Sequence, residues 1–281
     1  MNTNSFYVTL PSNTGSDNKT GHFTVTLPQT ISLSGEWEVA MTEIIYPYTW
    51  INFPRKHESE GVYSTTFYVG VHHAVVKVEI PPAHYETVEY LITAINEALG
   101  DIQVKVNEND INSGEEEQGN GTIATTKLSK VIMFRYNTNS KKVKMVIMNR
   151  KVHFVNLSKH MAYVLGFSNN WNTIFSGTSC EAKYMPDMSA GINTLYVYLN
   201  IIQPQLVGDS FSPLLRIIHV DGRHGMTVEK VFFNRQYIPV MQKDFGQLEM
   251  HIKTDGNQDV QFDSGKVIAT LHFQRRRLLF D

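Results

Sequence analysis

The feature that most constrains the fold is a change of hydrophobic period along the chain. Near the N-terminus apolar and polar side chains alternate, as Trp37, Val39 and Met41 do in the stretch GEWEVAMTEIIYPYTW. Proline and glycine interrupt such runs after five to eight residues throughout residues 6–80. Short alternating runs with closely spaced breaks predict a sandwich or barrel rather than βαβ units.

The period lengthens in the middle of the chain. Five apolar residues lie three and four apart and predict one face of an amphipathic helix: Val88, Leu91, Ile92, Ile95 and Leu99. Gly100 follows where a left-handed C-terminal cap is expected. The segment LSKHMAYVLGF predicts a second, short helix with Ser158 as its N-cap and Gly166 at its end. These helices, with the strands between them, predict an α+β segment.

The last hundred residues return to strand-like runs such as TLYVYLNII, PLLRIIHV and VIATLHF. Neither flank alone has the strands of a closed β domain. We therefore expect a mainly β protein with one discontinuous β domain, residues 1–82 and 181–281. An inserted α+β domain, residues 83–180, would interrupt it.

Composition narrows the cellular setting. The 281 residues carry a formal net charge of −2, so no global field favours nucleic acid or an acidic membrane. Cys180 is the single cysteine, which precludes an intrachain disulfide and favours an intracellular folding site. The N-terminal residues lack the pattern of a signal peptide, and no apolar run reaches the roughly 18 residues of a spanning helix. We expect no membrane association.

A search for chemistry finds no catalytic, cofactor-binding or metal-binding residues. His72 and His73 are adjacent and would point to opposite faces of a strand, while His219 and His224 bracket a predicted turn. Neither pair has zinc-site spacing. Cys180 lies in FSGTSCEAKY, which matches no nucleophile signature, and no phosphate-binding glycine loop is present. We expect a protein that is not an enzyme and needs no cofactor.

Each of two charged segments can be interpreted either as an ordinary solvated surface or as a binding site. The stretch 107–121 holds five acids and no base and lacks the ligand order of a calcium hand, which favours a solvated loop. Arg275, Arg276 and Arg277 near the C-terminus fit an exposed strand end that pairs with local acids. The alternative is a weak nucleic-acid contact or an acidic neighbouring subunit.

Glu43 falls on the apolar side of its alternating run and could be a catalytic acid, a bulge or a buried contact. No acid–base partner can be named, so we favour a β-bulge near Glu43 whose carboxylate accepts hydrogen bonds. The aromatic residues that follow, Tyr46, Tyr48, Trp50 and Phe53, could cap a sandwich, line a ligand or meet a partner.

Several segments of the chain can be compared with known families: FYVTLPSNTG, HFTVTLPQTISLSGEWEVAMTEIIYPYTW and, most specifically, NTLYVYLNIIQPQLVGDSFSPLLRIIHVDG, followed by VFFNRQYIPV and GKVIATLHF. They resemble the minor capsid proteins encoded by Polinton (Maverick) elements and adintoviruses. The intervening YETVEYLITAINEAL and LSKHMAYVLGF are also similar. The resemblance spans nearly the whole chain in order.

The resemblance implies a jelly-roll β-sandwich that forms the five-fold vertices of an icosahedral capsid. Its partners would be other copies of the chain in a pentamer and a double-jelly-roll major capsid protein. The implied location is the virion, after an intracellular stage in the cytoplasm or nucleus of the host. The inserted domain would project outward and could bind a host receptor.

Two other classes of function remain open. A jelly-roll receptor- or carbohydrate-binding module of the fibre-head type would share the predicted fold, although the N-terminus lacks the heptads of a trimeric stalk. A cupin-like enzyme would need a histidine-rich metal constellation that the spacing does not supply.

Overall fold

The computed structural model describes residues 4–54, 65–71, 74–107, 123–149, 151–167, 174–176 and 178–276. The chain divides into two compact units. One combines Met1–Trp50 with Ile192–Asp281, and the other is Ile51–Gly191. Each unit has its own hydrophobic core, and the two cores share no residue.

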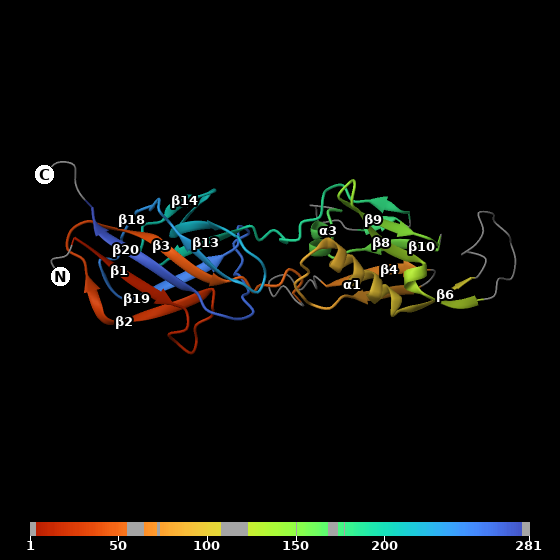
Figure 1. Ribbon diagram of the computed structural model, residues 1–281, viewed down its shortest axis with the longest axis horizontal. Coiled ribbons are helices and arrows are strands. Elements are labelled where there is room, and N and C mark those ends of the chain that lie inside the picture. The colour runs from red at the N-terminus through yellow and green to blue at the C-terminus, as the bar shows by residue number, and fades with distance from the viewer. Residues whose placement is uncertain are drawn as a thin grey trace. The chain divides into compact units, whose positions relative to one another are not determined.

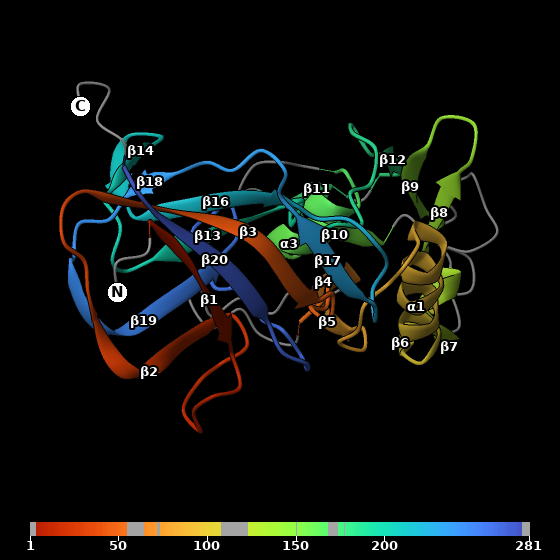
Figure 2. The ribbon, with the colours of Figure 1, turned by 60° about the vertical axis from the view of Figure 1, so that its left-hand side comes forward.

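The discontinuous unit contains a five-stranded and a four-stranded antiparallel sheet. The first has the order β1 (Ser5–Pro11), β20 (Ile268–Arg275), β3 (Trp37–Pro47) and β17 (Thr227–Val231), and β18 (Ile238–Pro239) also pairs with β3 (Figure 1). The second has the order β16 (Leu214–His219), β13 (Thr194–Leu199), β19 (Asp244–Lys253) and β2 (His22–Ser32). Figure 2 shows β2 and β19 side by side in this sheet.

This strand order is that of a jelly roll. If the eight main strands are numbered along the chain, the first sheet holds strands 1, 8, 3 and 6, and the second holds 2, 7, 4 and 5. Successive strands pass from one sheet to the other, except for strands 4 and 5, which pair within the second sheet, and this is the pattern of two Greek keys. The predicted mainly β, jelly-roll fold is confirmed. A short hairpin, β14 (Gln205–Val207) and β15 (Ser210–Ser212), connects β13 to β16.

Period-2 alternation builds the core between these sheets. In β19, Leu248, Met250 and Ile252 are buried while the residues between them face outward. In β3, Val39 and Met41 are equally buried. Because both sheets present such a row, the interior is a continuous apolar layer of the kind that stabilises a sandwich.

Among its described residues, the inserted unit combines short sheets with the two α-helices α1 and α3. Its four-stranded sheet has the order β11 (Ile174–Ser176), β10 (Val152–Asn156), β4 (Thr66–Val71) and β5 (Ala74–Glu79). A three-stranded sheet has the order β12 (Cys180–Glu181), β9 (Lys142–Ile147) and β8 (Ile132–Asn137). A third, two-stranded sheet pairs β6 (Gln103–Asn107) with β7 (Ile123–Lys127), and the 3₁₀ turn η1 (Leu128–Lys130) follows.

The helices form where the longer period predicts them. Helix α1 (Val88–Gly100) buries the five predicted apolar residues, and Asn96 from its side exchanges two hydrogen bonds of 2.9 Å with the backbone of Phe134. The prediction for Gly100 is wrong, because this residue lies inside the helix and Asp101 is a right-handed C-cap. In α3 (Lys159–Val164) the Ser158 hydroxyl accepts from Met161 N at 3.1 Å, as predicted. Gly166 ends that turn with φ of 79°.

The boundaries between the units differ from those predicted. Strands β4 and β5 were expected in the jelly roll, but β4 pairs with β10 of the inserted unit. Residues 51–82 and 181–191 therefore belong with the inserted unit rather than with the jelly roll. The prediction differs because alternating apolar residues indicate that a segment is a strand, but they do not identify the strand with which it pairs. No helix in the described ranges is both long and apolar enough to cross a membrane.

Candidate functional site

The suspected acid Glu43 lies at a β-bulge. Leu271 of β20 faces Met41 and Thr270 faces Glu43, so Thr42 is the extra residue in β3. The extra residue shifts the inward row, which resumes at Ile44 after Met41. The Glu43 carboxylate is half-buried and accepts a hydrogen bond from the Thr270 hydroxyl at 3.3 Å. The predicted bulge is confirmed, one residue away from Glu43. Among the described residues, the Glu43 carboxylate contacts the hydroxyl of Thr270, which is a structural contact rather than an acid–base pair.

The aromatic residues at the end of β3 and directly after it are divided between the two units. Tyr46 and Trp50 are buried in the jelly-roll core, and Tyr48 stacks on Trp50 with ring centroids 4.2 Å apart. Burial raises the pKa of Tyr46 to about 12, with a smaller contribution from Tyr48. Phe53 instead packs against Tyr85 in the inserted unit. Of the three roles considered for these aromatic residues, packing in a core fits best. The four rings belong to two different units and do not form one exposed patch.

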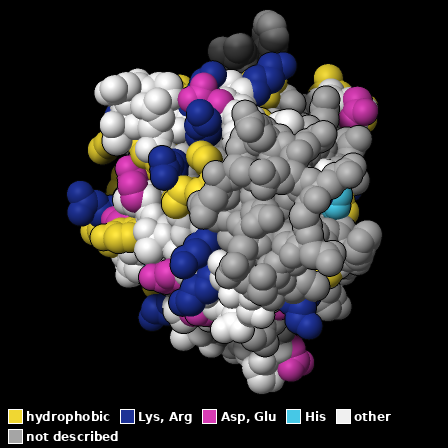
Figure 3. All heavy atoms as spheres, turned by 90° about the vertical axis from the view of Figure 1, so that its right-hand side faces the viewer, with side chains coloured by type: hydrophobic (Ala, Val, Ile, Leu, Met, Phe, Trp, Pro, Cys, Tyr) yellow, Lys and Arg dark blue, Asp and Glu magenta, His cyan; other side chains and the backbone are white. Residues whose placement is uncertain are grey.

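The predicted arginine cluster is only partly visible. Arg275 and Arg276 are exposed at the end of β20, and Arg277 lies outside the described residues. The Arg276 N–H donates to the backbone carbonyl of Glu36. Lys243, through a hydrogen bond and its charge, lowers the pKa of Glu36, and Arg276 adds a smaller effect. The Glu36 carboxylate pairs with Lys243, and within the described part of the chain neither Arg275 nor Arg276 forms an ion pair with an acid. Figure 3 shows another side of the molecule, on which Lys and Arg side chains are interspersed with Asp and Glu.

The remaining residues considered as catalytic or metal-binding candidates do not form a common site among the described residues. His72, His73 and the acidic stretch 107–121, except for Asn107, lie outside the described residues. His219 is exposed and lies 3.7 Å from Asp221. Burial raises the pKa of the Cys180 thiol, which is the opposite of what an activated nucleophile requires. Within the described ranges, no three His, Cys, Asp or Glu side chains are grouped so that they could hold a metal ion.

A pair of stacked histidines, which the sequence did not reveal, lies on the outer face of the second jelly-roll sheet. The rings of His22 and His251 are stacked with centroids 4.1 Å apart. Nε2 of His22 lies 2.6 Å from a Glu249 oxygen, and Nε2 of His251 lies 2.7 Å from an Asp259 oxygen. Burial lowers the pKa of His251, and Asp259 only partly offsets this effect. Alternation puts Glu249 and His251 on one face, but only the strand register places His22 opposite His251.

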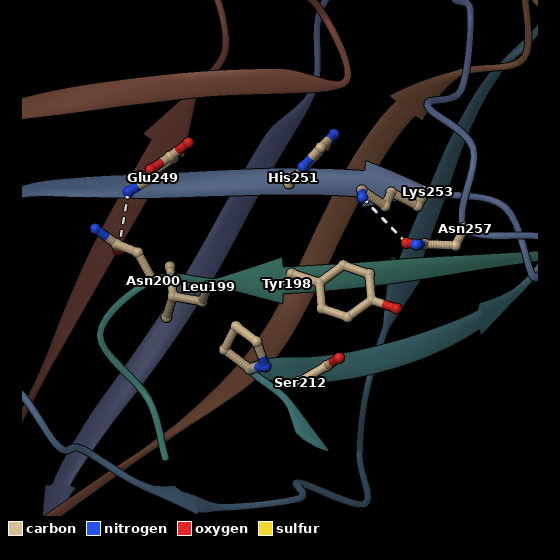
Figure 4. Close-up of a pocket in the computed structure, with 9 residues that line it drawn as sticks. Tyr198, Leu199, Asn200, Ser212, Glu249, His251, Lys253 and Asn257 are labelled. Carbon is tan, nitrogen blue, oxygen red and sulfur yellow. Dashed lines mark hydrogen bonds between the residues drawn. The ribbon is translucent and has the colours of Figure 1, made fainter. Parts of the chain in front are cut away.

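A groove of about 370 Å³ lies beside this pair (Figure 4). We call it the polar groove, and its polar lining comes from β13, β19, the end of β15 and the turn after β19. Its polar lining residues are Tyr198, Asn200, Ser212, Glu249, His251, Lys253 and Asn257, and Leu199 and Pro213 complete the lining.

A second surface feature is apolar. Leu206 of β14 and Phe211 of β15 are cross-strand partners and are 68% and 76% exposed. We call this pair the hairpin patch. Phe233, 95% exposed, and Met241, 63% exposed, are further large apolar side chains on the same unit. Exposed apolar side chains of this size commonly become buried when a partner binds.

Comparisons with known proteins find similarity to solved structures, but not to any family model. No protein-family model matches the sequence, and no curated protein is similar to it at a significant level. The structure is similar to the crystal structure of selenomethionine-labelled mavirus penton protein, with a TM-score of 0.48 and 15% sequence identity. The match covers 96% of this chain and 99% of that one. Similarity at this level does not by itself assign a function.

Proposed function

We propose that this chain is a structural virion protein, the minor capsid or penton subunit at the five-fold vertices of an icosahedral capsid. Five copies would surround each axis, and a double-jelly-roll major capsid protein would form the surrounding faces. The chain's sequence segments that resemble Polinton and adintovirus minor capsid proteins support this assignment. The observed jelly-roll strand order agrees with it.

Because one fold serves many functions, the surface must carry the argument. The observation that carries it here is the hairpin patch. A two-stranded hairpin is marginal in water, and this one exposes the apolar pair Leu206 and Phe211 at its centre. Covering that pair with a neighbouring subunit would remove both side chains from water.

The geometry of a five-fold ring determines which kind of interface the hairpin patch would have to form. A ring needs a head-to-tail interface, in which one surface of a subunit meets a different surface of the next. A stable interface of this kind buries roughly 1,000 Å² or more, with apolar anchors at its centre and a polar rim. We assign the hairpin patch as one such anchor, with Phe233 and Met241 as candidates for further apolar contact.

The inserted unit has a different proposed role. Its residues form a separate core, so it can change its surface without altering the strands of the jelly roll. We propose that it projects from the capsid and presents a surface to a host receptor.

The proposed role is non-enzymatic and needs no cofactor. The half-buried thiol of Cys180 and the hydrogen-bonded carboxylate of Glu43 are consistent with structural roles. The protein would occupy the virion after an intracellular stage in the cytoplasm or nucleus of the host. Arg275, Arg276 and Arg277 would meet local acids, an acidic neighbouring subunit or, less favourably, packaged nucleic acid.

The test is co-expression with the major capsid protein of the same element, followed by cryo-electron microscopy of the shells. We expect density for this chain at the five-fold vertices. The double variant Leu206→Ser and Phe211→Ser should empty the vertices while the chain remains folded. Val75→Ser is the matched control, since Val75 is 64% exposed on the inserted unit.

Two results would count against the proposal. Shells that never contain the wild-type chain would contradict the penton role. Vertices filled equally by the wild type and the hairpin double variant would contradict the assigned anchor, and would leave the penton role to be judged on the wild-type density.

A further inference from the structure

We propose that the polar groove is a binding site for a neutral sugar, in which one pyranose ring lies against Tyr198. The groove lies within the jelly-roll unit of a single chain, so this proposal does not depend on the penton assignment. Its volume of about 370 Å³ is within the roughly 300–1,000 Å³ range of small-molecule sites.

The aromatic component is Tyr198, whose side chain projects from the outward face of β13. The ring is half-buried and lies between the Lys253–Asn257 pair and Ser212 (Figure 4). Burial raises the pKa of its hydroxyl, which therefore stays protonated and can donate a hydrogen bond. A flat ring with one polar end suits a ligand that has an apolar face and a hydroxyl-bearing edge.

The polar lining is already held in place by contacts within the protein. The backbone N–H of Glu249 donates to Asn200 Oδ1 at 3.0 Å, and Lys253 Nζ donates to Asn257 Oδ1 at 3.0 Å. These contacts use the carbonyl oxygens of both amides. Among the described residues, neither amide NH₂ group has a protein partner. Both amides are thus oriented by the protein while their donors remain available.

Hydroxyl groups complete the set of donors and acceptors. The hydroxyls of Tyr198 and Ser212 make no hydrogen bond within the described part of the chain. Glu249 uses one carboxylate oxygen for His22, which leaves the other as an acceptor. Sugar hydroxyls both donate and accept, so a lining that offers both kinds of group matches them.

Charge favours a neutral ligand over an acidic one. Lys253 is positive and Glu249 is negative, and both border the groove. His251, which also lines the groove, is bonded to Asp259, and this carboxylate adds a further negative charge close by. An anionic ligand would therefore meet two carboxylates as well as the single ammonium group.

The lining argues against a peptide as the ligand. Peptide side chains bind in deep apolar pockets that hold an anchor residue. Here the apolar lining consists of Leu199, which is buried in the core, Pro213 and the ring of Tyr198. One exposed aromatic face with polar groups around it fits a pyranose better.

The test is a titration of the full-length protein with methyl pyranosides of glucose, galactose, mannose and N-acetylglucosamine, followed by saturation-transfer NMR. We expect at least one to bind with a dissociation constant on the order of 1 mM, because a ligand of this size makes few contacts. Tyr198→Ala should raise that constant by about tenfold or more, the loss expected when a ring contact is removed.

Two variants keep the experiment decisive. Tyr196→Ala is the matched control, since Tyr196 lies two residues away on the same face of β13 and does not line the groove; its binding should be unchanged. Asn257→Gly tests the polar lining without touching the sheet, because glycine tolerates the φ of 59° at this position. It should weaken binding severalfold with the unfolding temperature little changed.

The outcomes that overturn the proposal are specific. They are the absence of saturation transfer from all four pyranosides at about 50 mM, well above the expected constant, or equal losses in Tyr196→Ala and Tyr198→Ala. Tighter binding of a methyl sialoside than of any neutral pyranoside would overturn the assignment of a neutral ligand.

Discussion

The jelly roll and the inserted unit both bury an apolar core, yet they close it in different ways. The jelly roll pairs the two ends of the chain, with Ser5 of β1 opposite Gln274 of β20. The inserted unit is one continuous segment, and a buried side chain helps to close it. Asn52 Oδ1 accepts from Tyr85 N at 2.8 Å, and its amide nitrogen donates to the carbonyls of Tyr85 and Met188.

The difference shows how a jelly roll can carry a second, separately closed unit within one of its connections. The jelly roll needs strands from both sides of the insertion, so its formation depends on long-range pairing. The inserted unit has its own core and its own internal closure. We therefore expect the two units to respond separately to mutation.

The largest expected effect comes from truncating one core at a time. Leu271 is fully buried in the jelly roll and Leu91 is fully buried in the inserted unit. Leu271→Ala and Leu91→Ala should each cost about 2–5 kcal/mol of unfolding free energy, from lost burial plus the cavity left behind. Differential scanning calorimetry should show a shift in a different transition for each variant. One shared transition that moves equally in both variants would contradict the separation.

Asn52 tests the closure of the inserted unit. Asn52→Ala removes three hydrogen bonds at a buried site and should cost about 3 kcal/mol in the transition of that unit. Asn18 is the comparison in the jelly roll, where it exchanges two hydrogen bonds with the backbone of Thr24 at a half-buried position. Asn18→Ala should cost about 1 kcal/mol, and only in the jelly roll. Equal costs would show that Asn52 has no special role in closure.

Acidification should weaken the jelly roll through His272. Burial, followed by the charge of Arg235, lowers the pKa of His272 in the folded protein, and its Nδ1 lies 2.7 Å from the Tyr237 hydroxyl. The unfolded chain therefore takes up the proton first. The stability contribution is complete above about pH 6.5 and is lost as pH falls through the lower folded pKa.

Denaturant unfolding between about pH 7.5 and 5 would measure this loss, in the range where histidine titrates. His272→Gln should flatten the dependence of jelly-roll stability on pH, and His219→Gln, at an exposed site, should leave it unchanged. An unaltered pH dependence in His272→Gln would assign the loss to other groups.

The smallest expected effect is at the bulge. Glu43→Gln keeps an acceptor for the Thr270 hydroxyl and should cost no more than about 0.5–1 kcal/mol. Thr270→Val removes the same contact from the other side and should have a similar effect. If Glu43→Gln instead abolished a measurable enzymatic turnover while leaving the fold intact, the structural role given to Glu43 would be wrong.

Local patterns in the sequence were enough to predict the elements and the class of fold. Alternation placed Val39 and Met41 in the core, the slip after them predicted a bulge, and the longer period predicted α1. Each of these depends on neighbours within a few residues, which sequence displays directly.

Features that depend on register could not be predicted. The assignment of β4 to the inserted unit depends on its pairing with β10, far along the chain. The stack of His22 on His251 likewise exists only because β2 and β19 align these two residues. The polar groove combines Tyr198, Ser212 and Asn257 from separate segments, and no spacing in the sequence links them.

The central claim is five-fold assembly through the jelly roll, and native mass spectrometry tests it most directly. The purified chain would be measured alone and after mixing with the major capsid protein of the same element. The account predicts a species of five times the 32.0 kDa chain, either alone or once the partner is added. A chain that stays monomeric in both conditions, or that assembles only as a trimer, would contradict it.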